Sequence, residues 1–396
     1  MATDIATLRD ASGTLVRDNR HAVSPGLWVL AWKRLTSDTV GVVALAIVGA
    51  FIVMMLLSAT GFLARDWNRE VGVNYAPPSF VDVEATPAAG QSAPVTEAAP
   101  AGSEYKSTIV DPIGDVMERL KGGKGESQPA AGQPATSEEK SVDPLADVMA
   151  DIRAGKGVGA AVKPEERRAT LPFGGDKWGR DVLKKTIKGS ETSIFVGLAA
   201  AAVATFLGTL FGALAGYYGK WVDDFFNWFY SVFSSIPYLL LILAVAAVLQ
   251  QKGMLTIILI LGLTGWTGVF RLIRAEYLKH KSREYVQAAD AIGASNGRRM
   301  FIHIFPNVSH VVLVQLSILV VAFIKSEVIL SFLGFGVPVD VVSWGSMLNE
   351  AQNELILGKW WQLVAATTAM AILVTAFSLF TDALRDALDP KLRGLE

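Results

Sequence analysis

The chain of 396 residues contains no cysteine, and charged residues make up only 18 % of it. Without cysteine, neither a disulfide scaffold nor a cysteine-ligated zinc or iron–sulfur site can form. The net charge is −1, so the chain lacks the basic field that nucleic-acid binding requires. The charged fraction is below the roughly 25 % usual for soluble domains, while apolar residues reach 51 %.

Motifs of catalysis are also missing from the sequence. No GxxxxGK[ST] motif is present, and GGKGES at Gly122–Ser127 lacks its spacing. The chain therefore has no phosphate-binding loop for ATP. Its four histidines show no metal-ligand spacing, and no GxSxG motif marks a nucleophilic serine. We expect no catalytic residue, no metal site and no cofactor on this chain.

Long apolar segments predict an all-α integral membrane protein with six transmembrane helices. About 20 helical residues cross a ~30 Å hydrocarbon layer. The predicted spans are Thr39–Leu63, Thr192–Tyr218, Phe225–Leu249, Gly253–Phe270, Val308–Leu333 and Trp361–Thr381. The first helix extends to about residue 64, and the other five spans form a helical core over residues 191–383.

Lysine and arginine in the short loops set the predicted orientation. Segment 1–38, the loop between the fourth and fifth spans, and tail 384–396 each contain several lysines or arginines, and all three fall on one side. The positive-inside rule assigns this side to the cytoplasm. Lys184, Lys185 and Lys188 lie on the opposite side, beside a loop long enough for the rule to weaken.

The segment 65–190 is then an extracytoplasmic loop. Eleven of the 16 prolines lie between Pro77 and Pro172, which predicts a largely flexible segment. DPIGDVMERLKGGKG at 111–125 recurs as DPLADVMADIRAGKG at 143–157. Each copy predicts a short amphipathic helix with Asp as N-cap and Pro at its first position. The duplicated helix is either a docking element or a tolerated linker insertion.

The segment between the fourth and fifth spans carries the most specific motif. It reads EYVQAADAIGASNGRRMFIHIFPN, from Glu284 to Asn307. Ala288 and Ala289 predict a helix surface that another protein can approach closely. Gly293 permits a sharp turn, and Pro306 favours the start of a new helix.

This stretch resembles the EAA loop of ABC importer permeases, and we expect a cytoplasmic coupling loop at residues 276–307. The motif positions are occupied by Gln287, Ala288, Ala289, Gly293 and Pro306. Gln287 stands where the family has glutamate, and Glu284 lies one turn earlier. The resemblance implies that this helix inserts into an ATPase subunit and transmits ATP-driven motion. The alternative is an amphipathic re-entrant loop without a partner.

Further stretches resemble the C-type subunit of dipeptide/oligopeptide permeases. They are GGDKWGRDVL (Gly174–Leu183), LSFLGFGVP (Leu330–Pro338), SWGSML (Ser343–Leu348) and LRDALDPKLRG (Leu384–Gly394). The resemblance covers about residues 171–394, and the long loop before it departs from the family. It implies the type I ABC importer permease fold in the bacterial inner membrane. The implied partners are a second permease in a heterodimer, two ATPase subunits that bind ATP and Mg, and an extracytoplasmic substrate-binding protein.

Several residues within the predicted spans are candidates for the translocation path or for helix packing. Lys325 and Glu327 lie in the fifth span, where a charge costs about 2.5–3.5 kcal/mol. At i, i+2 they cannot form a simple pair, so each either lines the path or is accommodated at the interface. Pro237 should kink or locally unwind the third span. Gly208, Gly212 and Gly216 predict close helix packing, either within the chain or with a second permease.

The sequence thus predicts a non-catalytic permease subunit of an ATP-driven importer, with peptides as the expected substrate. An importer of the same family for nickel, glutathione or oligosaccharide is an alternative. An ion-driven secondary transporter is a second alternative, and it would require paired charges at mid-membrane. A third is a membrane-anchored scaffold that works through the repeat at 111–157.

Overall fold

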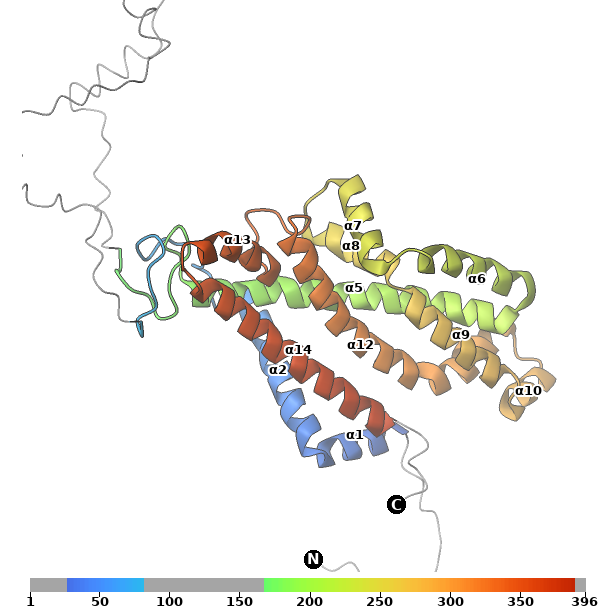
Figure 1. Cartoon of the computed structure of the whole chain (residues 1–396). Helices are drawn as coiled ribbons and strands as arrows, with labels where there is room; N and C mark the ends of the chain where they lie inside the picture. Colours follow the sequence, from blue (N-terminus) through green and yellow to red (C-terminus); the bar gives the residue numbers. More distant parts are fainter. Residues whose placement is uncertain (1–26, 82–166, 389–396) are drawn as a thin grey trace, which may run out of the picture. The chain divides into compact units, whose positions relative to one another are not determined.

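The computed structural model describes residues 27–81 and 167–388, and most of them are helical (Figure 1). The helices are α1 (Leu27–Ser37), α2 (Thr39–Ala59), α5 (Val182–Tyr218), α6 (Lys220–Ser234), α7 (Tyr238–Leu249), α8 (Met254–Thr264), α9 (Thr267–Lys281), α10 (Glu284–Ala291), α11 (Asn296–Arg298), the π-helix η1 (Arg299–Ile304), α12 (Phe305–Phe332), α13 (Trp344–Ile356) and α14 (Trp361–Leu388). The repeat predicted at 111–125 and 143–157 lies outside the described residues.

The described helices provide up to six membrane crossings, as the sequence predicts. Four continuous helical segments are long and apolar enough, namely α2, α5, α11–η1–α12 and α14. Two further crossings require that a bent pair of helices acts as one span. These pairs are α6 with α7, bent by 85°, and α8 with α9, bent by 41°.

Helix α5 begins ten residues before the predicted second span. The Asp181 side chain caps it, because Oδ1 accepts hydrogen bonds from the backbone N–H groups of Leu183 (2.9 Å) and Lys184 (3.4 Å). Lysines in its first turns lower the local hydropathy, so the apolar pattern alone starts the span at Thr192. The helix therefore extends past the apolar part into the polar end of the bundle.

The third span is broken at Pro237. Pro237 has no backbone N–H and is the N-cap residue of α7, with ψ of 127° instead of a helical value. The Ser235 hydroxyl donates to the Val232 carbonyl at 2.8 Å, which satisfies one acceptor at the end of α6. The two helices meet at a bend of 85°.

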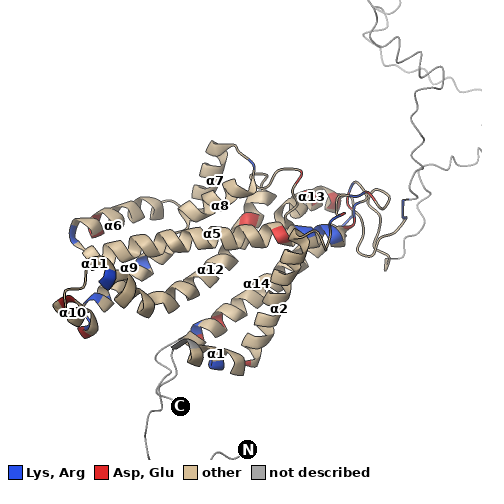
Figure 2. Cartoon of the chain, turned by 180° about the vertical axis from the view of Figure 1, so that it is seen from behind, with Lys and Arg blue, Asp and Glu red and all other residues tan. Residues whose placement is uncertain are grey.

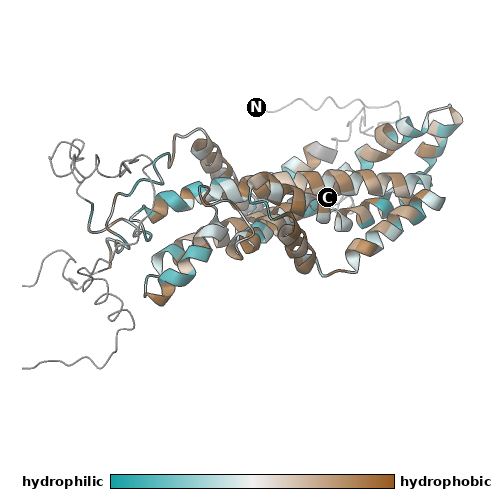
Figure 3. Cartoon of the chain, turned by 90° about the horizontal axis from the view of Figure 1, so that it is seen from above, coloured by the Kyte–Doolittle hydropathy of each residue, from teal (hydrophilic) through white to brown (hydrophobic). Residues whose placement is uncertain are grey.

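Helix α5 forms the centre of the bundle. Its alanines Ala200, Ala201 and Ala204 are fully buried, and they let neighbouring helices pack closely. The main apolar core joins α5 to α2, α8, α12 and α14. The helices are apolar along their middle parts, and charged residues gather near the ends of the bundle, as Figures 2 and 3 show.

At one end of α5, the segments on either side of residues 82–166 pair with each other. Isolated bridges join Glu70 to Arg180, Gly72 to Arg168 and Pro78 to Leu171. Gly179 has φ of +77°, and a Cβ atom there would lie 2.0 Å from the Gly72 carbonyl oxygen, so only glycine fits. These segments and α13 cover one end of the bundle, which we call the α13 end.

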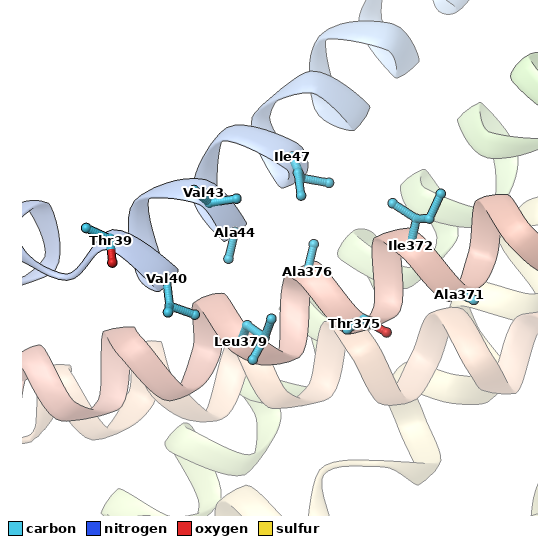
Figure 4. A pocket seen from close by; sticks show the side chains of 10 residues that line it. All are labelled: Thr39, Val40, Val43, Ala44, Ile47, Ala371, Ile372, Thr375, Ala376 and Leu379. Carbon is cyan, nitrogen blue, oxygen red and sulfur yellow. The ribbon is translucent and has the colours of Figure 1, made fainter.

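Helices α2 and α14 enclose an apolar groove. Val40, Ala44 and Ile47 on α2 face Ala376 and Leu379 on α14 (Figure 4). This groove opens on the surface of two membrane-crossing helices.

Candidate functional site: the coupling region

The predicted coupling loop forms a compact helical hairpin at the opposite end of α5. It comprises the end of α9, α10, α11, η1 and the start of α12, and we call residues 276–307 the coupling region. Its buried side chains, including Val286, Met300 and Ile304, share one apolar cluster with Tyr217 on α5 and Tyr277 on α9. The hairpin is therefore packed against the membrane-crossing helices.

The structure divides the motif residues of α10 between two faces. Ala289 and Val286 are each 4 % exposed and pack inward. Glu284, Gln287 and Ala288 lie on the exposed face. Only Ala288 of the two alanines is therefore open to an approaching partner, whereas the small size of Ala289 serves packing within the chain.

The end of α10 carries an exposed apolar side chain that the sequence motif does not include. Ile292 is 83 % exposed. Gly293 follows it with φ of +82°, and its N–H donates to the Asp290 carbonyl at 2.9 Å. A glycine in the left-handed conformation commonly follows the last turn of a helix, and Gly293 ends α10 in this manner. A Cβ at Gly293 would meet no atom within 4 Å, so the backbone conformation alone requires glycine there.

Pro306 lies in the first turn of α12, as predicted, but no break precedes it. The π-helix η1 leads directly into α12, and the Phe305 N–H donates to the carbonyl of Met300, five residues earlier. A π-turn leaves room for the bulky ring of Pro306. It also does not need the backbone N–H that proline lacks. Helix α11, η1 and α12 thus form one continuous helical segment.

Polar contacts tie the coupling region to the end of α5. The Tyr217 hydroxyl donates to Asn296 Oδ1 at 3.1 Å, and Lys281 Nζ donates to the Tyr217 carbonyl at 2.6 Å. Arg299 forms an ion pair with Asp290 at 2.5 Å, which joins η1 to α10. These contacts make the hairpin and the end of α5 one mechanical unit.

Two further contacts bind the parts of the hairpin to each other. The Tyr277 hydroxyl donates to the Met300 carbonyl at 3.2 Å. The Tyr285 hydroxyl lies 2.8 Å from His280 Nδ1, and burial raises the pKa of Tyr285 above its usual value. Tyr285 therefore stays neutral at physiological pH and can keep this hydrogen bond.

The two charged residues of the fifth span occupy different surroundings. Lys325 is exposed on α12. Glu327 is fully buried, and its carboxyl oxygens accept hydrogen bonds from Ser193 and Ser331, both at 2.7 Å. The structure does not bring Lys325, Glu327 and Pro237 together, since Pro237 lies on the exposed surface between α6 and α7.

The three glycines of α5 contact α9 within the same chain. A Cβ at Gly208 would lie 2.7 Å from the Trp266 carbonyl oxygen, and at Gly212 2.8 Å from that of Phe270. At Gly216 the corresponding distance to the Arg274 carbonyl oxygen is 2.6 Å. Of the two roles left open by the sequence, this geometry corresponds to packing inside the chain.

A buried polar cluster at the α13 end was not predicted from the sequence. Lys185 Nζ lies 2.9 Å from Asp176 Oδ2 and 2.5 Å from Glu350 Oε2, and its side chain is 1 % exposed. Gln362 and Glu354 complete what we call the carboxylate cluster. Asp176 belongs to the GGDKWGRDVL motif, and this motif was the only feature of the sequence that pointed to the cluster. The partners on α13 and α14 are distant in sequence.

Within the described ranges, no group of three histidine, aspartate or glutamate side chains is arranged to hold a metal ion. Neither the coupling region nor the carboxylate cluster therefore shows the geometry of a metal centre.

Comparison with known proteins identifies the family. The model of the family described as "Binding-protein-dependent transport system inner membrane component" matches residues 208–394. The dipeptide transport system permease protein DppC of Bacillus subtilis (strain 168) is 38 % identical over 221 residues, which cover 56 % of this chain and 69 % of that protein.

Two other relatives agree with this match. The oligopeptide transport system permease protein OppC of Bacillus subtilis (strain 168) is 37 % identical over 56 % of this chain and 72 % of its own length. OppC of Haemophilus influenzae (strain ATCC 51907 / DSM 11121 / KW20 / Rd) is 34 % identical over 56 % of this chain and 70 % of its own length. The chain therefore belongs to the family of inner membrane components of binding-protein-dependent transport systems, as a multi-pass protein of the cytoplasmic membrane.

Proposed function

We propose that the chain is the C-type permease subunit of an ATP-driven peptide importer and forms half of its translocation path. The relatives with the printed names dipeptide and oligopeptide transport system permease support the substrate class. The sequence contains no Walker A motif, so ATP and Mg belong to two ATPase subunits. A second permease and an extracytoplasmic substrate-binding protein complete the assembly.

The coupling region carries the proposal. Ala288 and Ile292 form a small exposed patch on α10 that an ATPase groove can cover. Burial of a side chain the size of Ile292 contributes about 1.5–3 kcal/mol. The small Ala288 next to it lets the ATPase surface approach closely.

The contacts of the hairpin give a route for motion into the membrane. When ATP binding closes the ATPase subunits, α10 moves with them. Lys281 and Asn296 transmit the movement to Tyr217 on α5, and η1 transmits it to α12. The membrane-crossing helices then shift between inward-facing and outward-facing states, provided ATP binding favours one of them.

The exposed face of α12 supports a role in the path for one charged residue. Lys325 is exposed and makes no ion pair with the described residues. We place the Lys325 ammonium along the path, where it would attract a peptide carboxylate. Glu327 instead holds α12 to α5 through Ser193.

The test of the coupling role is transport by the complete assembly reconstituted in proteoliposomes. Uptake should require ATP on the side of the ATPase subunits and should not follow an imposed ion gradient alone. Ala288→Trp should leave the assembly folded but reduce uptake per ATP hydrolysed at least severalfold, because the indole prevents close approach of the ATPase.

Thr36→Trp is the matched control. Thr36 is exposed on α1, and its hydroxyl donates to carbonyls of its own helix. This variant should transport normally. Equal uptake by Ala288→Trp and the unchanged chain would contradict the coupling role, and uptake driven by an ion gradient without ATP would favour a secondary transporter.

Substrate class is tested by competition. Di- and oligopeptides should compete for uptake of a labelled peptide, whereas nickel, glutathione and oligosaccharides should not. Competition by one of the latter compounds, with no effect of peptides, would identify a different branch of the family.

A further inference from the structure

The carboxylate cluster holds more negative than positive charge in a buried place. Asp176 is 0 %, Glu354 2 % and Lys185 0 % exposed, whereas the Glu350 side chain is half-buried, at 24 % exposed. Lys185 is the ammonium at the centre, and it already binds Asp176 and Glu350. If all three carboxyl groups were ionised, the cluster would carry a net charge of −2, which a water-poor site tolerates badly.

Glu354 is the carboxyl group of the cluster that has no side-chain hydrogen-bond partner. Asp176 Oδ1 accepts from the N–H groups of Trp178 and Arg180, and Gln362 Nε2 lies 3.3 Å from Glu350 Oε2. Neither Glu354 oxygen is hydrogen-bonded to a side chain in the part of the chain that the structure describes, and the backbone of Lys177 is the polar group that approaches it. Glu354 follows Glu350 by four residues, so both side chains lie on the same side of α13.

The position of Glu354 in the helix disfavours its charge further. It lies in the last turn of α13, where a negative charge opposes the helix dipole. Its own backbone carbonyl accepts from the N–H groups of Leu357 (3.0 Å) and Lys359 (2.8 Å), so this residue organises the whole C-terminal turn. The turn presents Leu355, Ile356 and Leu357 as exposed apolar side chains.

We propose that Glu354 is a proton-binding site that fastens the last turn of α13 to the carboxylate cluster. With a proton bound, Glu354 is neutral and stays buried beside Glu350. After the proton leaves, repulsion from Glu350 and Asp176 drives the carboxylate toward water, and the end of α13 with its apolar tip opens. The site would make this face of the transporter responsive to pH, independently of the coupling region.

The electrostatic surroundings agree with this arrangement. Burial raises the pKa of Glu354 to about 7, and the charges of Asp176 and Glu350 raise it as well. Lys185 opposes the shift, as does the backbone of Lys177. The Lys359 ammonium lies 5.5 Å from the centroid of a Trp361 ring, so its charge interacts with that ring.

The direction of the pH effect follows from the two states. In the open turn Glu354 is in water and has its usual pKa of 4.5. Between this value and the raised pKa, only the open state releases its proton. Opening therefore becomes up to about tenfold more frequent per pH unit in this window. Above the raised pKa, both states are ionised and the frequency levels off.

Hydrogen–deuterium exchange of the full chain, purified with its co-expressed transport partners, tests the proposal. Protection of amides 355–359, corrected for intrinsic exchange, should fall about tenfold per unit between pH of about 5 and about 7. In Glu354→Gln the same amides should show no fall. Amides in the middle of α12 are the internal reference and should not change in either protein.

Glu350→Gln is a second variant that does not alter Glu354 itself. Removal of one neighbouring negative charge lowers the pKa of Glu354, so protection should level off at a lower pH. This variant decides the question if Glu354→Gln fails to fold. The proposal would be overturned if protection fell equally in Glu354→Gln, or if it did not change with pH in the unchanged chain. It would also be overturned if protection in Glu350→Gln levelled off at the same pH as in the unchanged chain.

Discussion

The Lys281 ammonium lies 2.6 Å from the backbone carbonyl oxygen of Tyr217, so a lysine at the end of α9 caps the C-terminal end of α5. A cation at this position satisfies a terminal carbonyl and interacts favourably with the helix dipole. The contact is also a direct polar connection between the coupling region and the central helix.

Lys281→Met should therefore weaken coupling. The substitution removes the donor but keeps much of the aliphatic stem, at a cost of about 1 kcal/mol. We expect less uptake per ATP hydrolysed, measured in proteoliposomes. Lys279→Met is the control, because Lys279 pairs with Glu276 on the exposed surface of the same helix. Equal effects of the two substitutions would argue against a specific role for Lys281.

The turn after α10 should require glycine for its backbone conformation alone. Gly293→Ala forces a Cβ into a left-handed conformation and should cost about 1 kcal/mol, with a lower unfolding temperature and poorer coupling. Gly293→Asn should be milder, since asparagine tolerates this conformation better. Gly297→Ala changes a glycine of α11 that has open space around it, and this variant should be neutral. If Gly297→Ala were as harmful as Gly293→Ala, the strain argument would fail.

Helices α5 and α9 should separate when a methyl group is added between them. In Gly212→Ala the new Cβ would lie 2.8 Å from the Phe270 carbonyl oxygen, and backbone cannot move aside as a side chain can. We expect a loss of about 1–3 kcal/mol, seen as a lower unfolding temperature in detergent. Gly49→Ala, on α2 with no atom within 4 Å of the new Cβ, should be harmless. An unchanged unfolding temperature in Gly212→Ala would show that the two helices pack more loosely than these distances indicate.

The apolar segments predicted the membrane crossings, because hydropathy is a property of the local sequence. One local motif also marked the segment 276–307, which the structure folds into a helical hairpin, while its coupling role stays a prediction. Helix ends were less predictable. The first turns of α5 were not predicted because they contain Lys184, Lys185 and Lys188. Hydropathy indicates contact with lipid, and it does not indicate where a helix begins. The bend at Pro237 could be placed from sequence, but its 85° angle depends on how α7 packs.

The two faces of α10 show the same limit at the candidate site. Ala288 and Ala289 are adjacent and identical, and only tertiary packing shows that one is exposed and the other buried. The carboxylate cluster is a stronger case, because Lys185 meets Glu350 across 165 residues. Its chemistry arises from long-range contacts that no local pattern contains.

Adjacent lysines at the start of α5 provide the last prediction. Lys185 is buried between Asp176 and Glu350, whereas Lys184 forms an exposed ion pair with Asp66 at 2.7 Å. Lys185→Met leaves buried carboxylates without their cation and should cost about 3–5 kcal/mol. Lys184→Met should cost about 0–1 kcal/mol.

The pH dependence separates the two lysines further. The hydrogen bond from Lys184 lowers the pKa of Asp66 below 3.8, so the stability that this pair contributes is present above that value and is lost as the pH falls through the lowered pKa. The small effect of Lys184→Met should therefore vanish in strong acid. Thermal unfolding of both variants, followed from neutral pH into strong acid below the lowered pKa of Asp66, checks these outcomes. If Lys185→Met were as mild as Lys184→Met, the carboxylate cluster would not be the buried, charged structure on which the behaviour of α13 depends.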